Sequence, residues 1–362
     1  MNILYLSHLS GASYAGPTYS VPKQIEAQSK IDNVFWYNAT TQGKREWKEL
    51  QYYHDKTEFS DESIRCLPEP FNHPDIIVVE LFYNMTKSKL LKELIETNTP
   101  YVIIPRGELT KQAQKRKRLK KLAANILMCR RYAHKAAAIQ YLTEQEFIDS
   151  GVKWNSRHII IPNGIDMPCV VKYDFSIANI KCISIGRIEP YQKGLDLLIK
   201  ACKLAEKELR NANCSIVICG PDKEGKSQVL ITLVNKLGLQ DLISFHDAVY
   251  GEEKERMLLN SDVFIMPSRF EGHPMALIEA LSYGLPCVAS KGSNMSREVE
   301  TYNAGWIADN DIQSLCTAIK SLIANHHILK KYSSNAIKLA NNYNWASIAI
   351  ETHRKYESLI NE

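Results

Sequence analysis

The sequence lacks several features that would place it in a membrane or in an oxidising compartment. No hydrophobic run approaches the ~20 residues that a membrane-spanning helix needs. The opening segment, Met1–His8, has no basic residues before its apolar run and no cleavage site after it, so we interpret it as a first strand and not as a signal peptide. The nine cysteines include no Cys-x-x-Cys pair, which argues against a zinc site and against a disulfide framework. We therefore expect a cytoplasmic protein.

Low-complexity tracts and short repeats are also missing, and the composition is that of a folded protein. Hydrophobic residues make up 45% of the chain and charged residues 23%, far from the composition of disordered chains. A length of 362 residues exceeds what one hydrophobic core usually serves, so two domains are expected.

Short apolar runs alternate with longer amphipathic stretches along the whole chain. This alternation predicts βα units, with parallel sheets covered by helices on both faces. The expected strands are 3–7, 76–79, 101–104, 137–141 and 158–161 in the first half, and 181–185, 215–219, 243–245, 263–266, 286–289 and 305–308 in the second. We predict a first domain over residues 1–172 and a second over 173–344. The final helix, 345–362, is the candidate to pack back on the first domain.

The segment 111–135 is strongly basic. It carries ten lysines and arginines and no acidic residue, in a chain whose net charge is only +5. Leu119, Leu122, Ala123, Ile126 and Leu127 recur at helical spacing, which predicts an amphipathic basic helix suited to an anionic membrane surface or a lipid-linked phosphate. A solvated helix face is the alternative. Nucleic acid is not expected as a partner, because no aromatic platform accompanies the charge.

Residues Gly220–Ser227 match the P-loop pattern and follow an apolar run. An ATPase is therefore an alternative function. Against it, the motif lies in the second half of the chain, no strand ending in a magnesium-binding acid follows, and Pro221 removes one amide from the loop. A structural loop between strand and helix is favoured.

Four features of the second half suit a sugar nucleotide. Arg187 and Lys193 follow strands at the edge where open α/β folds bind ligands, and they can neutralise a diphosphate without a metal. Pro274 is expected at the first position of a helix, so the amides of Met275 and Ala276 would face an anion or sugar hydroxyls. Glu271 and Glu279, separated by seven residues, can accept hydrogen bonds from the sugar and from the ribose diol.

Together with the strand 286–290, these motifs resemble the retaining glycosyltransferases of family 4, which have the GT-B fold. The resemblance implies an α/β protein of two Rossmann-like domains that face each other across a cleft, an acceptor-side domain and then a domain that binds the nucleotide sugar. It assigns catalysis to Glu271, Arg187 and Lys193. Donor binding would involve these two cations with Gly16, His273, Met275, Ala276 and Glu279.

The first half carries weaker counterparts of the family motifs. Gly16 ends a glycine-containing turn after the first strand, where the backbone would approach the donor diphosphate. Arg106, Gly107 and Glu108 resemble the acceptor-side loop of bacterial polysaccharide transferases, and the basic segment follows directly. A structural salt bridge is the alternative for Arg106.

The resemblance implies transfer of a hexose, with retained configuration, from a nucleoside diphosphate sugar to a glycan hydroxyl. The acceptor would be linked to polyprenyl diphosphate, in lipopolysaccharide O-antigen, capsule or exopolysaccharide synthesis at the inner face of the membrane. No cofactor and no metal are expected, since the sequence contains no cysteine or histidine cluster. A P-loop protein and a non-catalytic sugar-nucleotide-binding protein remain the alternatives.

Overall fold

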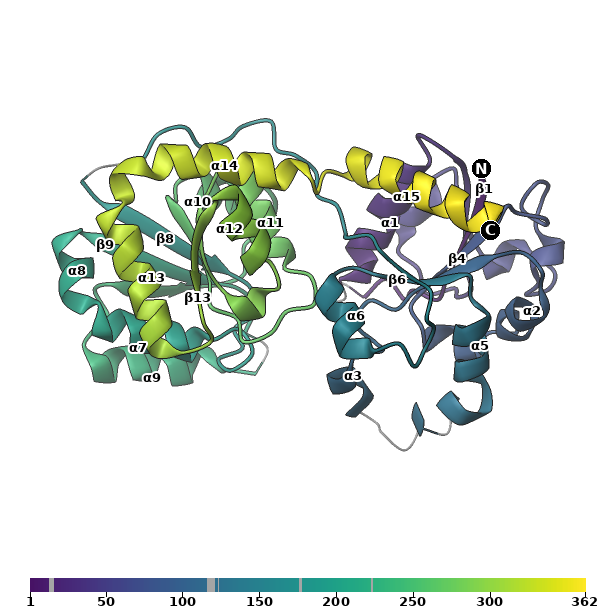
Figure 1. Ribbon diagram of the computed structural model, residues 1–362, viewed down its shortest axis with the longest axis horizontal. Coiled ribbons are helices and arrows are strands. Elements are labelled where there is room, and N and C mark those ends of the chain that lie inside the picture. Colours follow the sequence, from purple (N-terminus) through teal and green to yellow (C-terminus); the bar gives the residue numbers. More distant parts are fainter. Residues whose placement is uncertain (13–15, 116–120, 123, 176–177, 223) are drawn as a thin grey trace. The chain divides into compact units, whose positions relative to one another are not determined.

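The computed structural model describes residues 1–12, 16–115, 121–122, 124–175, 178–222 and 224–362. The chain forms two compact units (Figure 1). Unit 1 comprises Met1–Gly164 and Trp345–Glu362, and unit 2 comprises Ile165–Asn344. Over the described ranges, no helix combines the length and the apolar character needed to cross a bilayer.

The described part of unit 1 is built on a seven-stranded parallel sheet in the order β3-β2-β1-β4-β5-β6-β7. Its strands are β1 (Asn2–Ser7), β2 (Asn33–Asn38), β3 (Tyr53–Asp55), β4 (Ile76–Glu80), β5 (Tyr101–Ile104), β6 (Ala138–Tyr141) and β7 (His158–Ile160). Its helices are α1 (Pro17–Gln28), α2 (Leu90–Glu96), α3 (Lys111–Lys115), α5 (Arg130–Lys135), α6 (Glu144–Ser150) and α15 (Trp345–Asn361). Short 3-10 turns are η1 (Arg45–Glu49), η2 (Lys56–Glu58), η3 (Ile64–Cys66) and η4 (Asn84–Lys87), and η5 (Asn125–Cys129) is a π-helical turn.

The described part of unit 2 is built on a six-stranded parallel sheet in the order β10-β9-β8-β11-β12-β13. The strands are β8 (Ile180–Ile185), β9 (Cys214–Cys219), β10 (Ile243–His246), β11 (Val263–Met266), β12 (Cys287–Ser290) and β13 (Gly305–Ala308). The helices are α7 (Leu195–Leu204), α8 (Glu206–Asn211), α9 (Ser227–Leu237), α10 (Gly251–Leu259), α11 (Met275–Ser282), α12 (Ser296–Tyr302), α13 (Ile312–Ala324) and α14 (Leu329–Asn341), with 3-10 turns η6 (Lys291–Ser293) and η7 (His326–Ile328).

Both sheets are buried on both faces, as the continuous apolar strands predict. In β1, Leu4 and Leu6 enter one core cluster while Ile3 and Tyr5 enter the other, because successive side chains of a strand point to opposite faces. The predicted fold class of two Rossmann-like α/β domains is confirmed. Two strands of unit 1, β2 and β3, are absent from the sequence prediction.

The division between the units falls after Gly164, before the predicted boundary at residue 172. Ile165 already belongs to unit 2, since its amide donates to the carbonyl oxygen of Tyr343 at 2.7 Å. Helix α15 returns to unit 1, where it packs beside α1 (Figure 1). The hydroxyl of Tyr356 on α15 donates to the side chain of Gln140 at 2.7 Å, which fixes this helix to β6.

The basic segment differs from the single amphipathic helix predicted over 111–135. Its described residues form α3, the π-helical turn η5 and α5. Leu122 is 50% exposed, and the buried face of α5 consists of Tyr132 and Ala133. Four of its cations, Arg116, Lys117, Arg118 and Lys120, lie outside the described residues, as do Leu119 and Ala123.

Candidate active site

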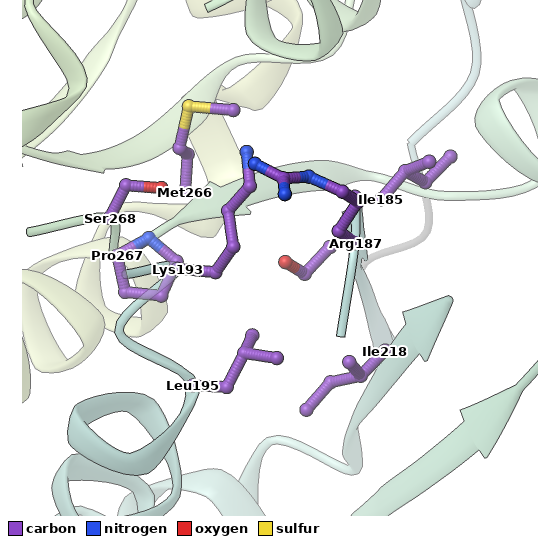
Figure 2. A pocket seen from close by; sticks show the side chains of 10 residues that line it. Ile185, Arg187, Lys193, Leu195, Ile218, Met266, Pro267 and Ser268 are labelled. Carbon is purple, nitrogen blue, oxygen red and sulfur yellow. The ribbon is translucent and has the colours of Figure 1, made fainter. Parts of the chain in front are cut away.

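The candidate site lies where the strand order of unit 2 reverses. Strand β8 has β9 on one side and β11 on the other, so the connections after β8 and β11 leave the sheet in opposite directions. Open α/β sheets bind ligands in the crevice that forms at such a point, outside the carboxyl ends of the strands. A pocket opens here (Figure 2). It is lined by Ser184, Ile185, Gly186, Arg187, Lys193, Leu195, Ile218, Met266, Pro267 and Ser268.

Two glycines let the backbone segments around this pocket approach one another. A Cβ atom at Gly220 would lie 1.7 Å from the carbonyl oxygen of Gly186. Gly194 has a φ of +63°, and a Cβ there would lie 1.9 Å from the carbonyl oxygen of Pro267. A side chain at either position would push the loops apart. The glycines therefore set the width of the crevice.

Lys193 and Glu271, predicted as site residues from separate motifs, form an ion pair. The Lys193 Nζ lies 2.7 Å from Glu271 Oε1, and the side chains are 17% and 9% exposed. The Ser268 hydroxyl donates to the same carboxylate oxygen at 2.6 Å. Among the described residues, both hydrogen bonds of the Glu271 side chain use Oε1, and Oε2 makes none. One carboxylate oxygen is thus anchored and the other is available.

Arg187 lines the same pocket as Lys193. Its guanidinium makes one long hydrogen bond, 3.4 Å, to the side-chain oxygen of Gln192. In Figure 2 the two cationic side chains extend to the same side of the pocket. Two cations converge on one pocket, and among the described residues a single carboxylate, that of Glu271, bonds to them. This arrangement favours an anionic ligand.

Helix α11 begins beside this pocket, but one residue later than predicted. Pro274 is the N-cap residue, with φ −85° and ψ 68°, and Met275 is the first helical residue. The amide of Met275 donates to the carbonyl oxygen of His273 at 3.0 Å, so it is not open to a ligand. Nδ1 of His273 lies 3.0 Å from the sulfur of Met275. The Ala276 amide makes no hydrogen bond within the described ranges, and it is the donor that remains at this helix end.

Glu279 on α11 has a partner that the sequence analysis missed. The Nζ atom of Lys254, on α10, lies 2.6 Å from Glu279 Oε1. The two side chains are 28% and 32% exposed, so the pair stands at the surface. No pattern in the sequence links these residues, which lie on different helices.

A second missed contact ties together the two loops that bear the site residues. Arg269 donates to both carboxylate oxygens of Asp196, at 2.6 and 2.8 Å, and to the carbonyl oxygen of Tyr191 at 2.7 Å. Burial alone would raise the pKa of Asp196, but the hydrogen bonds and charge of Arg269 hold it below its ordinary value. This clamp holds the segment that carries Lys193 against the segment that carries Glu271.

The P-loop-like segment does not have the geometry of a phosphate cradle. The carboxylate of Asp222 accepts hydrogen bonds from the amides of Lys226 and Ser227, both at 2.8 Å. The pKa of Asp222 is lowered to about 2, and the largest cause is hydrogen bonding from the side chain and the amide of Ser227. The Lys226 ammonium lies 2.6 Å from Glu189 and 2.9 Å from Glu224. The amides and the lysine that a P-loop uses to bind phosphate are thus already bonded to the carboxylates of Asp222, Glu189 and Glu224.

The predicted acceptor-side residues of unit 1 are engaged with other parts of that unit. Arg106, in a left-handed conformation with φ 48°, pairs with Glu80 at 2.7 Å, and the side chains are 4% and 0% exposed. The Gly107 amide donates to Glu146. Glu108 accepts from the amide of Phe82 at 2.6 Å. The geometry favours the salt-bridge alternative for Arg106.

Gly16 is the N-cap residue of α1, and its carbonyl oxygen accepts from the amide of Tyr19 at 3.0 Å. A Cβ at Gly16 would meet no atom within 4 Å, so packing does not demand glycine there. Ser13, Tyr14 and Ala15, which precede it, lie outside the described residues. A donor contact at Gly16 stays a prediction.

Within the described ranges, no three histidines, cysteines or acids gather in the manner of a metal site. One Asp-x-Asp sequence, Asp309-Asn310-Asp311, follows β13. Asp309 pairs with Lys291 at 2.6 Å, and Asp311 caps α13 through the amide of Ser314 at 2.8 Å. Both carboxylates therefore serve local structure.

The second unit matches a known family. Residues 177–339 match the model described as "Glycosyl transferases group 1". The putative colanic acid biosynthesis glycosyltransferase WcaL of Salmonella typhimurium is 29% identical over 178 residues, which are 47% of this chain and 43% of that protein. The amylovoran biosynthesis glycosyltransferase AmsK of Erwinia amylovora is 30% identical over 150 residues, 40% of this chain and 36% of that protein. The chain thus spans less than half the length of these relatives.

Solved structures share the fold over the full chain. Sucrose-phosphate synthase from Thermosynechococcus elongatus has a TM-score of 0.71 at 15% identity, with 100% of both chains covered. HepE from Anabaena, solved in complex with UDP and glucose, has a TM-score of 0.69 at 17% identity and covers 99% of this chain and 100% of its own. At such identities the likeness shows the fold alone, which is the predicted GT-B type.

Proposed function

We propose that this protein is a glycosyltransferase that takes a sugar from a nucleoside diphosphate donor bound to unit 2. The observation that carries the proposal is the ion pair of Lys193 with Glu271, beside Arg187, at the point where the strand order of a parallel sheet reverses. The match of residues 177–339 to the group 1 glycosyl transferases supports it. The name of WcaL and the UDP complex of HepE point in the same direction.

In the proposed reaction, Arg187 and Lys193 neutralise the diphosphate as it leaves. The bond from the anomeric carbon to the phosphate oxygen breaks, a bond to the acceptor hydroxyl oxygen forms, and the hydroxyl proton moves to the departing diphosphate. Fixed cations stabilise the charge that develops on that leaving group. The amide of Ala276 adds a donor at the N-terminus of α11. The acceptor oxygen would attack on the face from which the diphosphate leaves, so the configuration would be retained. A metal would not be needed, because two protein cations supply the charge.

The two carboxylates of the Glu-x7-Glu array would hold the donor by its hydroxyls. Glu271 is anchored through Oε1 by Lys193 and Ser268, which leaves Oε2 to accept from a sugar hydroxyl. Glu279 would accept from the ribose diol while Lys254 fixes its other side. His273 and Met275 are proposed to border the sugar.

Exchange of Lys254 for glutamine tests the ribose assignment. Without the ammonium, the Glu279 carboxylate loses its anchor, and we expect the nucleoside diphosphate to bind about 3- to 10-fold more weakly, the effect of roughly one hydrogen bond. The measurement is isothermal titration calorimetry with the ribose nucleotide and its 2′-deoxy analogue, and Lys207→Gln on α8 is the control. The preference for ribose should shrink in Lys254→Gln. If the wild type binds the ribose nucleotide and its 2′-deoxy analogue with equal affinity, Glu279 does not bind the ribose diol.

The acceptor is proposed to be a glycan hydroxyl, carried on polyprenyl diphosphate at the inner face of the membrane. The names of WcaL and AmsK, which refer to exopolysaccharides, support a place in surface-polysaccharide synthesis, such as O-antigen or capsule. The basic segment 111–135 would face the anionic membrane. The protein would then be cytoplasmic and peripheral to the membrane.

A nucleotide screen distinguishes this function from a P-loop protein. We expect one nucleoside diphosphate among UDP, GDP, ADP and dTDP to raise the melting temperature in the presence of EDTA, and ATP with magnesium is tested in parallel without EDTA. Arg187→Ala should abolish the shift, because the diphosphate loses a cation, whereas Lys226→Ala should keep it. Stabilisation by ATP with magnesium alone, lost in Lys226→Ala, would refute the transferase and assign the nucleotide to Gly220–Ser227.

A further inference from the structure

Unit 1 contains a second hollow with a marked chemical character, which we call the basic pocket. It lies between α3 and the π-helical turn η5, at the loop before β7, and has a volume of about 420 Å³. This volume is within the range of small-molecule sites. It is lined by Lys111, Gln114, Lys121, Leu122, Asn125, Arg130, Lys153 and Trp154.

The charge of the basic pocket has a single sign. Of the eight described residues that line it, four are cations and none is acidic. Lys111, Arg130 and Lys153 form no ion pair within the described ranges. Two other hollows lined by described residues of unit 1 are different, since one includes Glu26, Glu49 and Glu69 and the other mixes lysines with glutamates. Cations gathered without counter-charges repel one another unless an anion joins them.

Trp154 forms the aromatic part of the pocket wall. Trp154 is 3% exposed, and its indole Nε1 has no hydrogen-bond partner among the described residues. The Nε1 atom itself is buried from solvent, so it is not a donor toward the pocket. Lys153 lies over the Trp154 ring, 5.5 Å from its centroid, so this wall of the pocket carries a cation held against an aromatic ring.

The remaining polar groups of the pocket are held in place. The Nζ atom of Lys121 donates to the carbonyl oxygen of Ala113 at 2.8 Å and lies 4.6 Å from the centre of the Tyr83 ring. The Tyr83 hydroxyl is 2.9 Å from Gln114 and 3.0 Å from Asn125. Asn125 begins the π-helical turn, a distortion that is frequent at functional sites. Hydrogen bonds therefore fix the positions of Gln114, Lys121 and Asn125 in the wall of the basic pocket.

We infer that the basic pocket binds a phosphate or diphosphate group, at a site separate from the proposed donor site of unit 2. Several cations around one hollow suit a compact ligand of more than one negative charge. The group could belong to a soluble diphosphate or to a lipid headgroup, and the experiment separates these sources. The inference holds whether or not unit 2 transfers a sugar.

The first experiment is calorimetric titration of inorganic pyrophosphate into the full chain carrying Arg187→Ala, which removes binding at the donor site. Adding Arg130→Gln and Lys153→Gln should weaken the binding at least 10-fold. Lys30→Gln with Lys56→Gln, two exposed lysines of unit 1, makes the same charge change and should leave the affinity unaltered. Pyrophosphate should also change the tryptophan emission of the parent, and Trp154→Phe should abolish that change.

The second arm uses phosphatidylcholine vesicles with and without polyprenyl diphosphate, or with phosphatidylglycerol. Flotation with polyprenyl diphosphate vesicles, lost in Arg130→Gln/Lys153→Gln, assigns the site to a lipid-borne group, and pyrophosphate binding alone assigns it to a soluble one. Either result supports the inference. No binding in both arms, or an equal loss in the Lys30/Lys56 control, would overturn it. UDP titrated into the same variants on the natural Arg187 background tests the donor site independently.

Discussion

Replacing Lys193 with alanine is expected to slow sugar transfer about 10²- to 10³-fold, the usual effect of removing one group that stabilises a leaving anion. Lys193 has two tasks in the proposed reaction. It neutralises the diphosphate, and through its 2.7 Å contact it holds the Glu271 carboxylate in place. Its loss therefore affects the transition state more than the bound donor, and kcat should fall further than KM rises.

Two controls accompany this variant. Lys207→Ala, an exposed lysine of α8 in the same unit, should transfer sugar at the wild-type rate. Glu271→Gln keeps the shape of the side chain and removes its charge, so it should bind the nucleoside diphosphate while transferring slowly. A Lys193→Ala protein with undiminished kcat would place the chemistry elsewhere.

The second large effect concerns stability. Replacing Arg106 with methionine should lower the free energy of unfolding of unit 1 by about 3–5 kcal/mol, because it leaves the Glu80 carboxylate buried without its counter-charge. Arg106 also donates to Gln24 at 2.6 Å and to Asn163 at 2.8 Å, so several polar groups lose a partner. Unfolding in urea is monitored through hydrogen exchange of the backbone amides in β4 and β5, which reports on unit 1 separately.

A double variant shows whether the buried charge causes that loss. Arg106→Met with Glu80→Gln removes both charges, and it should recover part of the stability lost in Arg106→Met alone. If Arg106→Met is as stable as the wild type but cannot transfer sugar, Arg106 has the acceptor-side role that the sequence predicts.

The sequence predicts the architecture well where strands are apolar and regularly spaced. Every expected strand is found, because buried parallel strands form continuous β-branched runs such as Ile76–Glu80. Strand β2, with the sequence Asn-Val-Phe-Trp-Tyr-Asn, has an apolar run that is aromatic more than β-branched, and the three-residue β3 is too short to give a signal. Strand β2 pairs with β1, and the edge strand β3 pairs with β2, which no local pattern encodes.

The candidate site is predictable only in part. Lys193 and Glu271 are foreseeable because each follows a strand at the same sheet edge, and the structure brings them into contact. The clamp of Arg269 on Asp196 and the pair of Lys254 with Glu279 join residues far apart in the chain, so their contacts depend on the fold. The position of Arg106 after a strand suggests a site residue, but the structure pairs this arginine with the buried Glu80. A position at a strand end therefore does not by itself identify a site residue.

The most direct test of the central claim is donor turnover in the presence of EDTA. The full chain is incubated with UDP-, GDP-, ADP- and dTDP-sugars, without acceptor and then with a polyprenyl diphosphate-linked glycan, and release of the nucleoside diphosphate is measured. We predict release from one donor, accelerated by the acceptor and reduced at least 100-fold in Lys193→Ala, in line with the loss expected for such a group. Absence of release from every donor, or equal release by Lys193→Ala, would contradict a glycosyltransferase site in unit 2.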